Sequence, residues 1–485
     1  MSGKGKFHAV QRAGFVRSST SKARFSISLA LVLVLLALSG CSSTNEATNP
    51  ASDIGVSETA IRIGVGVSDL DGLRAAGIAL APTLTTGNLS KRVTAQFEKW
   101  NQAGGINGRQ IEPVILTWDP TKPATQDRFC ADATIDNQLF AVIAVNGLNS
   151  KTVQCVVDAG VPLFFGEVPT DASLATGLLI SIAPSTESIA RIGTEAALAS
   201  GSITPDAVIG ILAGNDLSGT TGSSVAKQAL ESAGHKTVVV SVNTQQGDVG
   251  AINAESALAS NTFKGSSVSH VMVLLGVVSA SGFWASSAGQ GFTFTVLDTA
   301  SANCTAFGAS RAPAAAAGAT CMTTFGDSVT PAGSIRQDNS FETECRIQFD
   351  ETFAGDFPTK SSPGVPAGDT IKLADGTILS SDAPFDTCTL LNVMKLGLEK
   401  SGESPTRPKF MDAVSLLGDV PVGLASNGKG SITPDKHSIA DSIHSVILTL
   451  ANLQTVQSTS GTFNGCPVPR SCWVPVSDTW FPVDR

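Results

Sequence analysis

The sequence contains no tyrosine and only five histidines. Without tyrosine, any aromatic wall of a binding site must come from phenylalanine or tryptophan. Four of the five histidines are scattered beyond residue 200 and no Cys-x-x-Cys pair occurs, so the spacing expected of a metal site is missing. Also missing are a Gly-x-Ser-x-Gly elbow, a His-Glu-x-x-His motif and a Gly-x-x-x-x-Gly-Lys-Ser or -Thr phosphate loop. These absences argue against an enzyme and against a metal or another cofactor.

Charge divides the sequence into a basic beginning and an acidic remainder. The first 40 residues carry six of the 32 Lys and Arg residues and none of the 41 Asp and Glu residues. The remainder therefore carries 26 basic and 41 acidic side chains, a net charge of −15. A domain with that charge repels a phosphate backbone, so we expect no nucleic-acid partner.

The basic beginning leads into the apolar run 27–38, which is too short to span a bilayer comfortably and is typical of an export signal. The run ends in Leu38-Ser39-Gly40-Cys41, which resembles a bacterial lipobox. The resemblance implies cleavage before Cys41 and lipidation of its thiol; the alternative is an ordinary cleaved signal with a coincidental cysteine. We therefore expect a signal peptide over residues 1–40, a flexible tether over 41–58, and an extracytoplasmic protein held at the cell membrane by a lipid anchor.

The cysteine count predicts disulfides. Once Cys41 is set aside, eight of the nine cysteines remain, an even number in a chain that leaves the reducing cytoplasm. We expect four disulfides, although the sequence alone cannot fix their pairing. Proximity along the chain favours Cys130 with Cys155, Cys304 with Cys321, Cys345 with Cys388, and Cys466 with Cys472.

Residues 61–119 hold the pattern around which the rest of the chain is organised. Two strand-like runs, 61–67 and 111–118, flank a helix whose apolar residues recur at spacings of four, four and three. That helical face must pack on a sheet and consists of Leu89, Val93, Phe97 and Trp100. The helix is then stopped, and the chain reversed, by Gly104, Gly105 and Gly108. The pattern predicts a strand, a crossover helix and a parallel strand.

The turn over residues 101–109 reads Asn-Gln-Ala-Gly-Gly-Ile-Asn-Gly-Arg. In this position it resembles the extracytoplasmic solute-binding proteins of the leucine/isoleucine/valine-binding family, which serve ABC importers. The alternative is an ordinary glycine-rich helix stop in another α/β protein. The resemblance implies an α/β protein with the type I periplasmic-binding-protein fold, in which a multi-crossing hinge joins two Rossmann-like, doubly wound lobes. It also implies a monomer that captures a small solute between its lobes for an ABC permease.

Helix and strand patterns alternate beyond this unit as far as Thr299, in the rhythm of parallel sheets, before an Ala/Gly-rich insertion interrupts them. In the resembled family the chain crosses between the lobes three times. Carried over, the crossings fall near Ala183, Thr323 and Leu450. We thus expect the first lobe over residues 59–183 and 323–450, and the second lobe over residues 184–322 and 451–485.

Ligands of open parallel sheets bind where the strands end at their carboxyl edge. Six residues of such loops are candidate ligand contacts: Asn149, Ser150, Glu167, Asp216, Asp298 and Thr299. Asn149 and Ser150 precede a helix and could hold a ligand carboxylate, or either could simply cap that helix. Asp298 stands where the resembled family places the acidic residue for the ligand's α-ammonium group; otherwise it is a turn residue.

Two features depart from the resembled family. Glu167 occupies a loop where amino-acid binders carry small and hydroxyl residues for the ligand carboxylate, which Glu167 would repel unless it pairs with a cation or stays protonated. Those binders commonly clasp the ligand with tyrosine, so the aromatic candidates here, unless they are core residues, are Phe164, Phe165, Phe283 and Trp284. The identity of the solute is therefore open, and a ligand sensor with the same fold or an anchored hydrolase are the alternatives.

Overall fold

The structure is a computed structural model. It describes residues 53–75, 85–119, 122–145, 147–201, 203–244, 249–298, 319–324, 338–354, 359–361, 370–372, 378–380, 385–423, 429–449, 455–458, 461–464 and 472–483. The chain separates into residues 1–49 and 50–485, and every described residue belongs to the second unit. The predicted signal sequence and Cys41 lie outside the described residues. Among the helices of the described ranges, none combines the length and the apolar character needed to cross a membrane.

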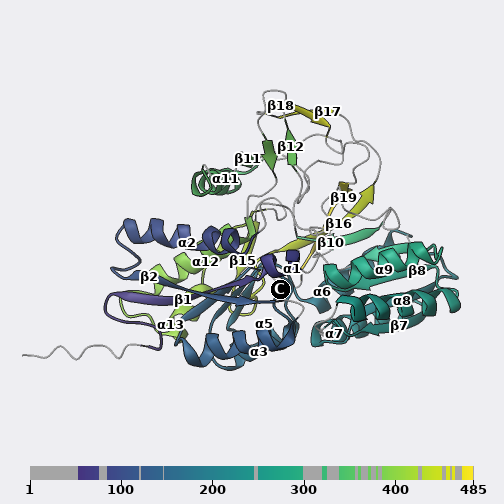
Figure 1. The fold of residues 1–485 in the computed structure, drawn as a ribbon, viewed down its shortest axis with the longest axis horizontal. Coiled ribbons are helices and arrows are strands. Elements are labelled where there is room, and N and C mark those ends of the chain that lie inside the picture. Colours follow the sequence, from purple (N-terminus) through teal and green to yellow (C-terminus); the bar gives the residue numbers. More distant parts are fainter. Residues whose placement is uncertain are drawn as a thin grey trace, which may run out of the picture. The chain divides into compact units, whose positions relative to one another are not determined.

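The first part of the chain builds a parallel sheet of five strands (Figure 1). In chain order these are β1 (Ala60–Ser68), β2 (Gln110–Trp118), β3 (Ala141–Ala144), β4 (Leu163–Phe165) and β5 (Leu179–Ser181). They lie in the order β2-β1-β3-β4-β5, and all neighbours run parallel. The helical segments between them are α1 (Leu70–Ala75), α2 (Thr86–Gln102), α3 (Pro123–Ala131) with a π-helical turn (Asp132–Asp136), α4 (Ser150–Asp158) and α5 (Asp171–Leu174).

Helix α2 forms as its apolar spacing predicts. One buried core joins strand β1 to the predicted face of the helix, namely Leu89, Val93, Phe97 and Trp100. At the end of the helix, Gly104 and Gly105 adopt positive φ angles of 101° and 78°. A Cβ on Gly105 would lie 2.1 Å from the carbonyl oxygen of Arg109, so no other residue fits there without a shift of the backbone. The predicted glycine turn between α2 and β2 is confirmed.

The second sheet has seven strands. They are β6 (Val208–Gly214), β7 (Lys236–Val242), β8 (His270–Leu274), β9 (Thr295–Asp298), β10 (Thr320–Thr323), β16 (Ser442–Thr449) and β19 (Cys472–Pro482). Their order is β19-β16-β10-β9-β8-β6-β7; β6 to β10 are parallel, whereas β16 and β19 are antiparallel to their neighbours. Helix α6 (Thr186–Ala199) precedes β6, and the parallel strands are linked by α7 (Leu217–Ser232), α8 (Val249–Gly265) and α9 (Val277–Gly289).

Both sheets contain the same five-strand arrangement. The order β2-β1-β3-β4-β5 of the first sheet recurs as β7-β6-β8-β9-β10 in the second. Strand order therefore reverses between β1 and β3 in one sheet and between β6 and β8 in the other, and such topological switch points are where doubly wound sheets bind ligands. The predicted fold class, with two Rossmann-like units, is confirmed.

Beyond β10 the chain returns to the first sheet. Helices α12 (Phe385–Ser401) and α13 (Arg407–Ser415) share the core of β1 and α2, and the ring of Phe410 lies 5.4 Å from that of Phe140 and 5.6 Å from that of Phe164. Helix α11 (Ser340–Thr352) contacts both α2 and α12. The other elements are short strands: β11 (Thr359–Ser361), β12 (Thr370–Lys372), β13 (Ile378–Ser380), β14 (Gly418–Pro421), β15 (Lys429–Ile432), β17 (Thr455–Ser458) and β18 (Gly461–Asn464).

Strand β16 belongs to a different sheet from the one that the sequence suggested. It runs antiparallel to β10, with Val446 opposite Cys321. We expected residues 323–450 in the first lobe, whereas residues 442–449 of this range lie in the seven-stranded sheet. The sequence could not reveal this, because pairing between strands so far apart in the chain leaves no local pattern.

The segment that joins β15 to β16 lies beside the end of β5. The amide of Ser181 donates to the carbonyl of His437 over 3.0 Å, and the amide of Ile439 donates to the carbonyl of Ser181 over 2.6 Å. The buried ammonium group of Lys436 donates to the carbonyl of Ile439 over 3.0 Å and lies 3.1 Å from Oδ1 of Asp441. Two stretches that lead from one sheet to the other are thus hydrogen-bonded side by side.

Two of the expected disulfides are present. Cys130–Cys155 joins α3 to α4 and Cys345–Cys388 joins α11 to α12, each with a Cα separation of 6.2 Å. Cys321 is disulfide-bonded as well, while its predicted partner Cys304 lies outside the described residues. Cys472 begins β19, and its predicted partner Cys466 also lies outside them, so the pairing of these two cysteines stays a prediction.

Candidate functional site

The loops at the carboxyl edge of the first sheet are hydrogen-bonded to one another. The indole Nε1 of Trp118, at the end of β2, donates to the carbonyl of Gly147 over 2.9 Å. The amide of Gly147 in turn donates to Oε1 of Glu167 over 2.8 Å. Gly147 has a φ of 77°, and a Cβ there would lie 2.5 Å from Oγ of Ser68. The amide of Asp69, after β1, donates to the carbonyl of Trp118 over 2.7 Å, so the loops after four of the five strands are hydrogen-bonded to one another.

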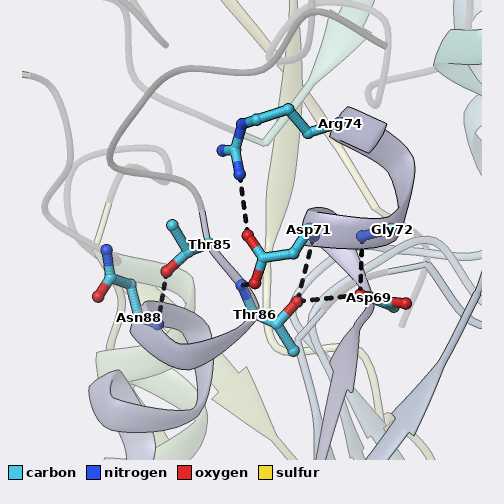
Figure 2. Close-up of polar contacts among 7 residues, drawn as sticks. All are labelled: Asp69, Asp71, Gly72, Arg74, Thr85, Thr86 and Asn88. Carbon is cyan, nitrogen blue, oxygen red and sulfur yellow. Dashed lines mark hydrogen bonds and ion pairs between the residues drawn. The ribbon is translucent and has the colours of Figure 1, made fainter. Parts of the chain in front are cut away.

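The loop after β1 is tied to the start of α2 (Figure 2). Oδ1 of Asp69 accepts hydrogen bonds from the amide of Gly72 at 2.9 Å and from the hydroxyl of Thr86 at 3.4 Å. Asp71 and Thr86 are bonded twice, since the amide of each donates to the side chain of the other over 3.3 and 3.2 Å. Figure 2 also shows Arg74 paired with Asp71, at 2.9 Å. The carboxylates of Asp69 and Asp71 are thus hydrogen-bonded within the segment that joins β1 to α2, and they fix the backbone of that segment.

Asn149 and Ser150 begin α4. The side chain of Asn149 accepts a hydrogen bond from the amide of Thr152 at 2.8 Å, so Asn149 is the N-cap of α4, as one of the two interpretations held. Ser150 is buried, and its hydroxyl donates to Oδ2 of Asp216 over 3.4 Å. The same hydroxyl accepts a hydrogen bond from the amide of Ser218, also at 3.4 Å. Ser150 thereby contacts an element of the other sheet.

Asp216 stands at the N-cap of α7, directly after β6. Its Oδ1 accepts a hydrogen bond from the amide of Gly219 at 3.0 Å, which leaves Oδ2 to meet Ser150. Strand β3 precedes Ser150, and strand β6 precedes Asp216. Each strand borders the switch point of its own sheet. The structure thus brings together two predicted site residues from the two sheets, at the N-termini of two helices.

Glu167 follows β4 and is partly buried. Burial raises the pKa of its carboxyl to about 7; the nearby charge of Asp386 acts in the same direction, and the hydrogen bond from Gly147 opposes both. Asp386, in the first turn of α12, also has a raised pKa because it is buried, although the amide of Thr387 and the charge of Arg92 partly stabilise its ionised form. The pKa of Glu167 therefore lies near neutral pH, and that of Asp386 is shifted in the same direction. The repulsion expected between Glu167 and an anionic ligand would be weakened by protonation.

Comparison with known proteins finds similarity in structure only. No family model matches the sequence, and no curated protein does. A solved structure of a fatty acid ABC transporter substrate-binding protein from Thermomonospora curvata matches with a TM-score of 0.58 and 14% identity, over 87% of this chain and 94% of that one. A solute binding protein of an ABC transporter from Rhodopseudomonas palustris, in complex with 3,4-dihydroxy benzoic acid, matches with a TM-score of 0.58 and 11% identity, over 88% and 98%. A possible leucine/isoleucine/valine-binding protein from Rhodopirellula baltica matches with a TM-score of 0.57 and 14% identity, over 86% and 98%.

This chain has the fold of ABC-transporter solute-binding proteins. The type I periplasmic-binding-protein fold that the turn over residues 101–109 implied is thereby confirmed. Its two doubly wound sheets place Asn149, Ser150 and Glu167 at the carboxyl edge of the first and Asp216 at that of the second. The role of each residue toward a ligand stays a prediction.

For the remaining candidate ligand contacts, the structure describes the backbone only or nothing. Asp298 ends β9, where its backbone pairs with Val273 of β8 and Cys321 of β10; its side chain and the whole of Thr299 lie outside the described residues. All four aromatic candidates are at most 2% exposed and belong to the core: Phe164, Phe165, Phe283 and Trp284. Among the described residues, no three His, Cys, Asp or Glu side chains gather as metal ligands would.

Two residues of the site were missed by reasoning from the sequence. The charge of Asp386 acts on Glu167 because α12 packs back on the first sheet, which no local pattern shows. Ser218 meets Ser150 because α7 begins opposite α4. A signal for the second did exist, since Asp216 directly before a predicted helix indicates an N-cap and places Ser218 in the first turn.

Proposed function

We propose that this protein is an extracytoplasmic solute-binding protein, which captures a small molecule between two lobes and delivers it to an ABC permease. The observation that carries the proposal is the contact between Ser150 and Asp216, because it joins the switch points of two doubly wound sheets. Ligands of such sheets bind outside the carboxyl ends of the strands at these points. A solute held there would touch both lobes at once.

The lobes would follow the two sheets. The first would contain residues 59–183 and the returning elements α11 to β15, and the second would contain residues 184–322 with β16 and β19. The hydrogen-bonded stretches at Ser181 and Ile439 would form part of the hinge, because they lead from one sheet to the other. Closure about this hinge would bury the solute, and the closed form is the one that a permease would recognise.

The chemistry of the site suggests a solute with a carboxylate, an amino acid or a related compound. Helix N-termini favour anions, and the amide of Ser218 at the start of α7 already donates to the hydroxyl of Ser150, a position that a ligand oxygen could take. Solved structures of the same fold are described in complex with benzoate, 4-hydroxybenzoate and leucine. If the solute carries an ammonium group, Asp298 at the end of β9 would receive it.

The remaining parts of the proposal concern where the protein works. Cys41 would carry the lipid that holds a monomer at the outer side of the cell membrane. The tether would be shorter than the expected 41–58, because Val56 packs in the core of the first sheet and the amide of Arg407 donates to the carboxylate of Asp53. Neither a cofactor nor a catalytic step is needed for capture and delivery. The permease would be the protein partner.

Identification of the bound solute tests the proposal. Small molecules released from the purified, folded protein would be identified by mass spectrometry and titrated back by calorimetry. We expect one molecule that binds once per chain and is released unchanged. Conversion of that molecule into a product would instead favour the anchored hydrolase, and the absence of any small-molecule binding would contradict both.

A further inference from the structure

A hollow lies between α2, α11 and α12. It has a volume of 330 Å³ and an apolar floor formed by Trp100, Phe349, Phe353 and Leu391, each of them buried. None of the residues that line it belongs to the loops around Ser150 and Asp216. Its volume is at the lower end of the range typical of small-molecule sites, about 300 to 1,000 Å³.

The walls of the hollow are fixed to one another. The disulfide Cys345–Cys388 joins α11 to α12 covalently. Helix α2 is held to α11 by the ion pair of Lys99 with Glu351, at 2.9 Å. A hollow whose three helices are tied together in this way is preformed, so a ligand would not have to order it.

Two further cationic side chains of α2 contact aromatic rings at α11. The guanidinium carbon of Arg92 lies 5.4 Å from the centre of the Phe349 ring, and Nζ of Lys91 lies 5.2 Å from that of Phe353. Both distances are within the range of a cation–π contact. The positive charges of α2 therefore border the aromatic floor directly.

The rim of the hollow is polar and carries charges of both signs, and the charge of Arg92 also acts on the nearby Asp386. Among the lining residues Arg92 and Lys395 are cationic, whereas Glu344 is the acidic one. The ammonium group of Lys395 also contacts Glu399, one turn further along α12. Arg92 carries a planar guanidinium group of the kind that binds a carboxylate through two parallel hydrogen bonds.

We propose that this hollow is a second small-molecule site, which takes an aromatic carboxylate with its ring on the floor of Trp100, Phe349 and Phe353 and its carboxylate toward Arg92. Burying the ring covers apolar surface that the floor presents to the opening. The amide side chains of Gln96 and Asn392, also on the rim, can each donate a further hydrogen bond to the carboxylate. The site needs neither the second sheet nor the hinge.

A probe of this chemistry tests the proposal. Sodium 1-naphthoate would be titrated by calorimetry into the full mature chain, alongside 1-naphthamide, which has the same rings without the charge. We expect naphthoate to bind and naphthamide to bind at least about tenfold more weakly, because a charge-assisted contact to Arg92 is lost.

Three variants locate the binding. Arg92→Gln should weaken naphthoate binding by about tenfold, and Gln96→Trp, which fills the hollow from its rim, should abolish it. Lys409→Gln removes an equal charge from the exposed face of α13 and should leave the affinity unchanged. Melting followed by circular dichroism checks that each variant is folded. Naphthoate binding that survives Gln96→Trp in a folded protein would place the ligand elsewhere and overturn the proposal, as would the absence of binding to the unaltered chain.

Discussion

The hydroxyl of Ser150 lies 3.4 Å from Oδ2 of Asp216 and so joins two helices that start from different sheets. Helix α4 follows β3 of the first sheet and α7 follows β6 of the second, and both strands border a switch point. Asp216 also caps its own helix through Oδ1. One carboxylate therefore has two separable roles, a local one in α7 and a long-range one toward Ser150.

Two substitutions of Asp216 test its local role as the N-cap of α7. Asn is about as good an N-cap as Asp, so Asp216→Asn should leave the stability of the ligand-free protein nearly unchanged. Asp216→Ala removes the cap and should lower the free energy of unfolding by about 1 kcal/mol. Urea unfolding followed by circular dichroism measures both. Equal losses in the two variants would show that the charge, rather than the cap, is what stabilises this helix start.

The raised pKa of Glu167 predicts that the stability of the folded protein depends on pH. Its pKa in the folded protein is about 7, raised from 4.5 by burial, so between these values the folded state binds more protons than the unfolded state. Stability should therefore fall as the pH rises from 4.5 to 7. The loss from this group is up to about 3 kcal/mol.

Because the pKa of Asp386 is shifted in the same direction, the wild type alone cannot show which carboxyl causes the pH dependence. The variant Glu167→Gln isolates the contribution of Glu167. The free energy of unfolding of the wild type, minus that of Glu167→Gln, should be smaller at about pH 8 than at about pH 5. A difference that stays constant over this range would mean that Glu167 remains ionised throughout.

We predict the largest effect on the affinity for the solute when Asp298 is substituted. If a cationic group of the solute pairs with this carboxylate inside a closed site, loss of the charge leaves the cation buried and uncompensated, at roughly 3 to 5 kcal/mol. Asp298→Asn should then weaken binding of the co-purifying solute by on the order of a hundredfold or more, with little change in the stability of the free protein. Calorimetry on both proteins measures this. Equal affinities would show that the carboxylate of Asp298 does not bind the solute and would move the search to Glu167 and Asp216.

The disulfide Cys130–Cys155 closes a loop with a sequence separation of 25 residues. Replacing both cysteines with alanine should lower stability by about 3 kcal/mol, mainly because the unfolded chain gains freedom. Thiol counting on unfolded, unreduced mature protein should find no free thiol apart from an unmodified Cys41. Two or more free thiols would contradict the expectation of four disulfides.

Lipidation is tested at Cys41. The wild type should partition into detergent and carry the mass of the acyl chains, whereas Cys41→Ala should remain unacylated or uncleaved. A variant that still partitions into detergent with the acylated mass would rule out this cysteine as the anchor point.

Local patterns predicted the elements of the fold, and long-range packing decided the rest. The spacing of Leu89, Val93, Phe97 and Trp100 predicted the buried face of α2, because helical geometry fixes which side chains share a face. The place of β16 beside β10, and of Asp386 near Glu167, depends on how distant segments meet. The candidate site shows the same division: Asn149 and Asp216 could be found as helix starts, but their neighbours across the two sheets could not.

Native mass spectrometry of the purified chain and of Ser150→Trp tests the central claim most directly, because a tryptophan at this position would occupy the contact between α4 and α7. The wild type is predicted to carry one small molecule per chain, and the folded variant, checked by circular dichroism, is predicted to carry none. A wild type without any bound molecule, or a variant that retains the same molecule, would contradict capture of a solute at the meeting point of Ser150 and Asp216.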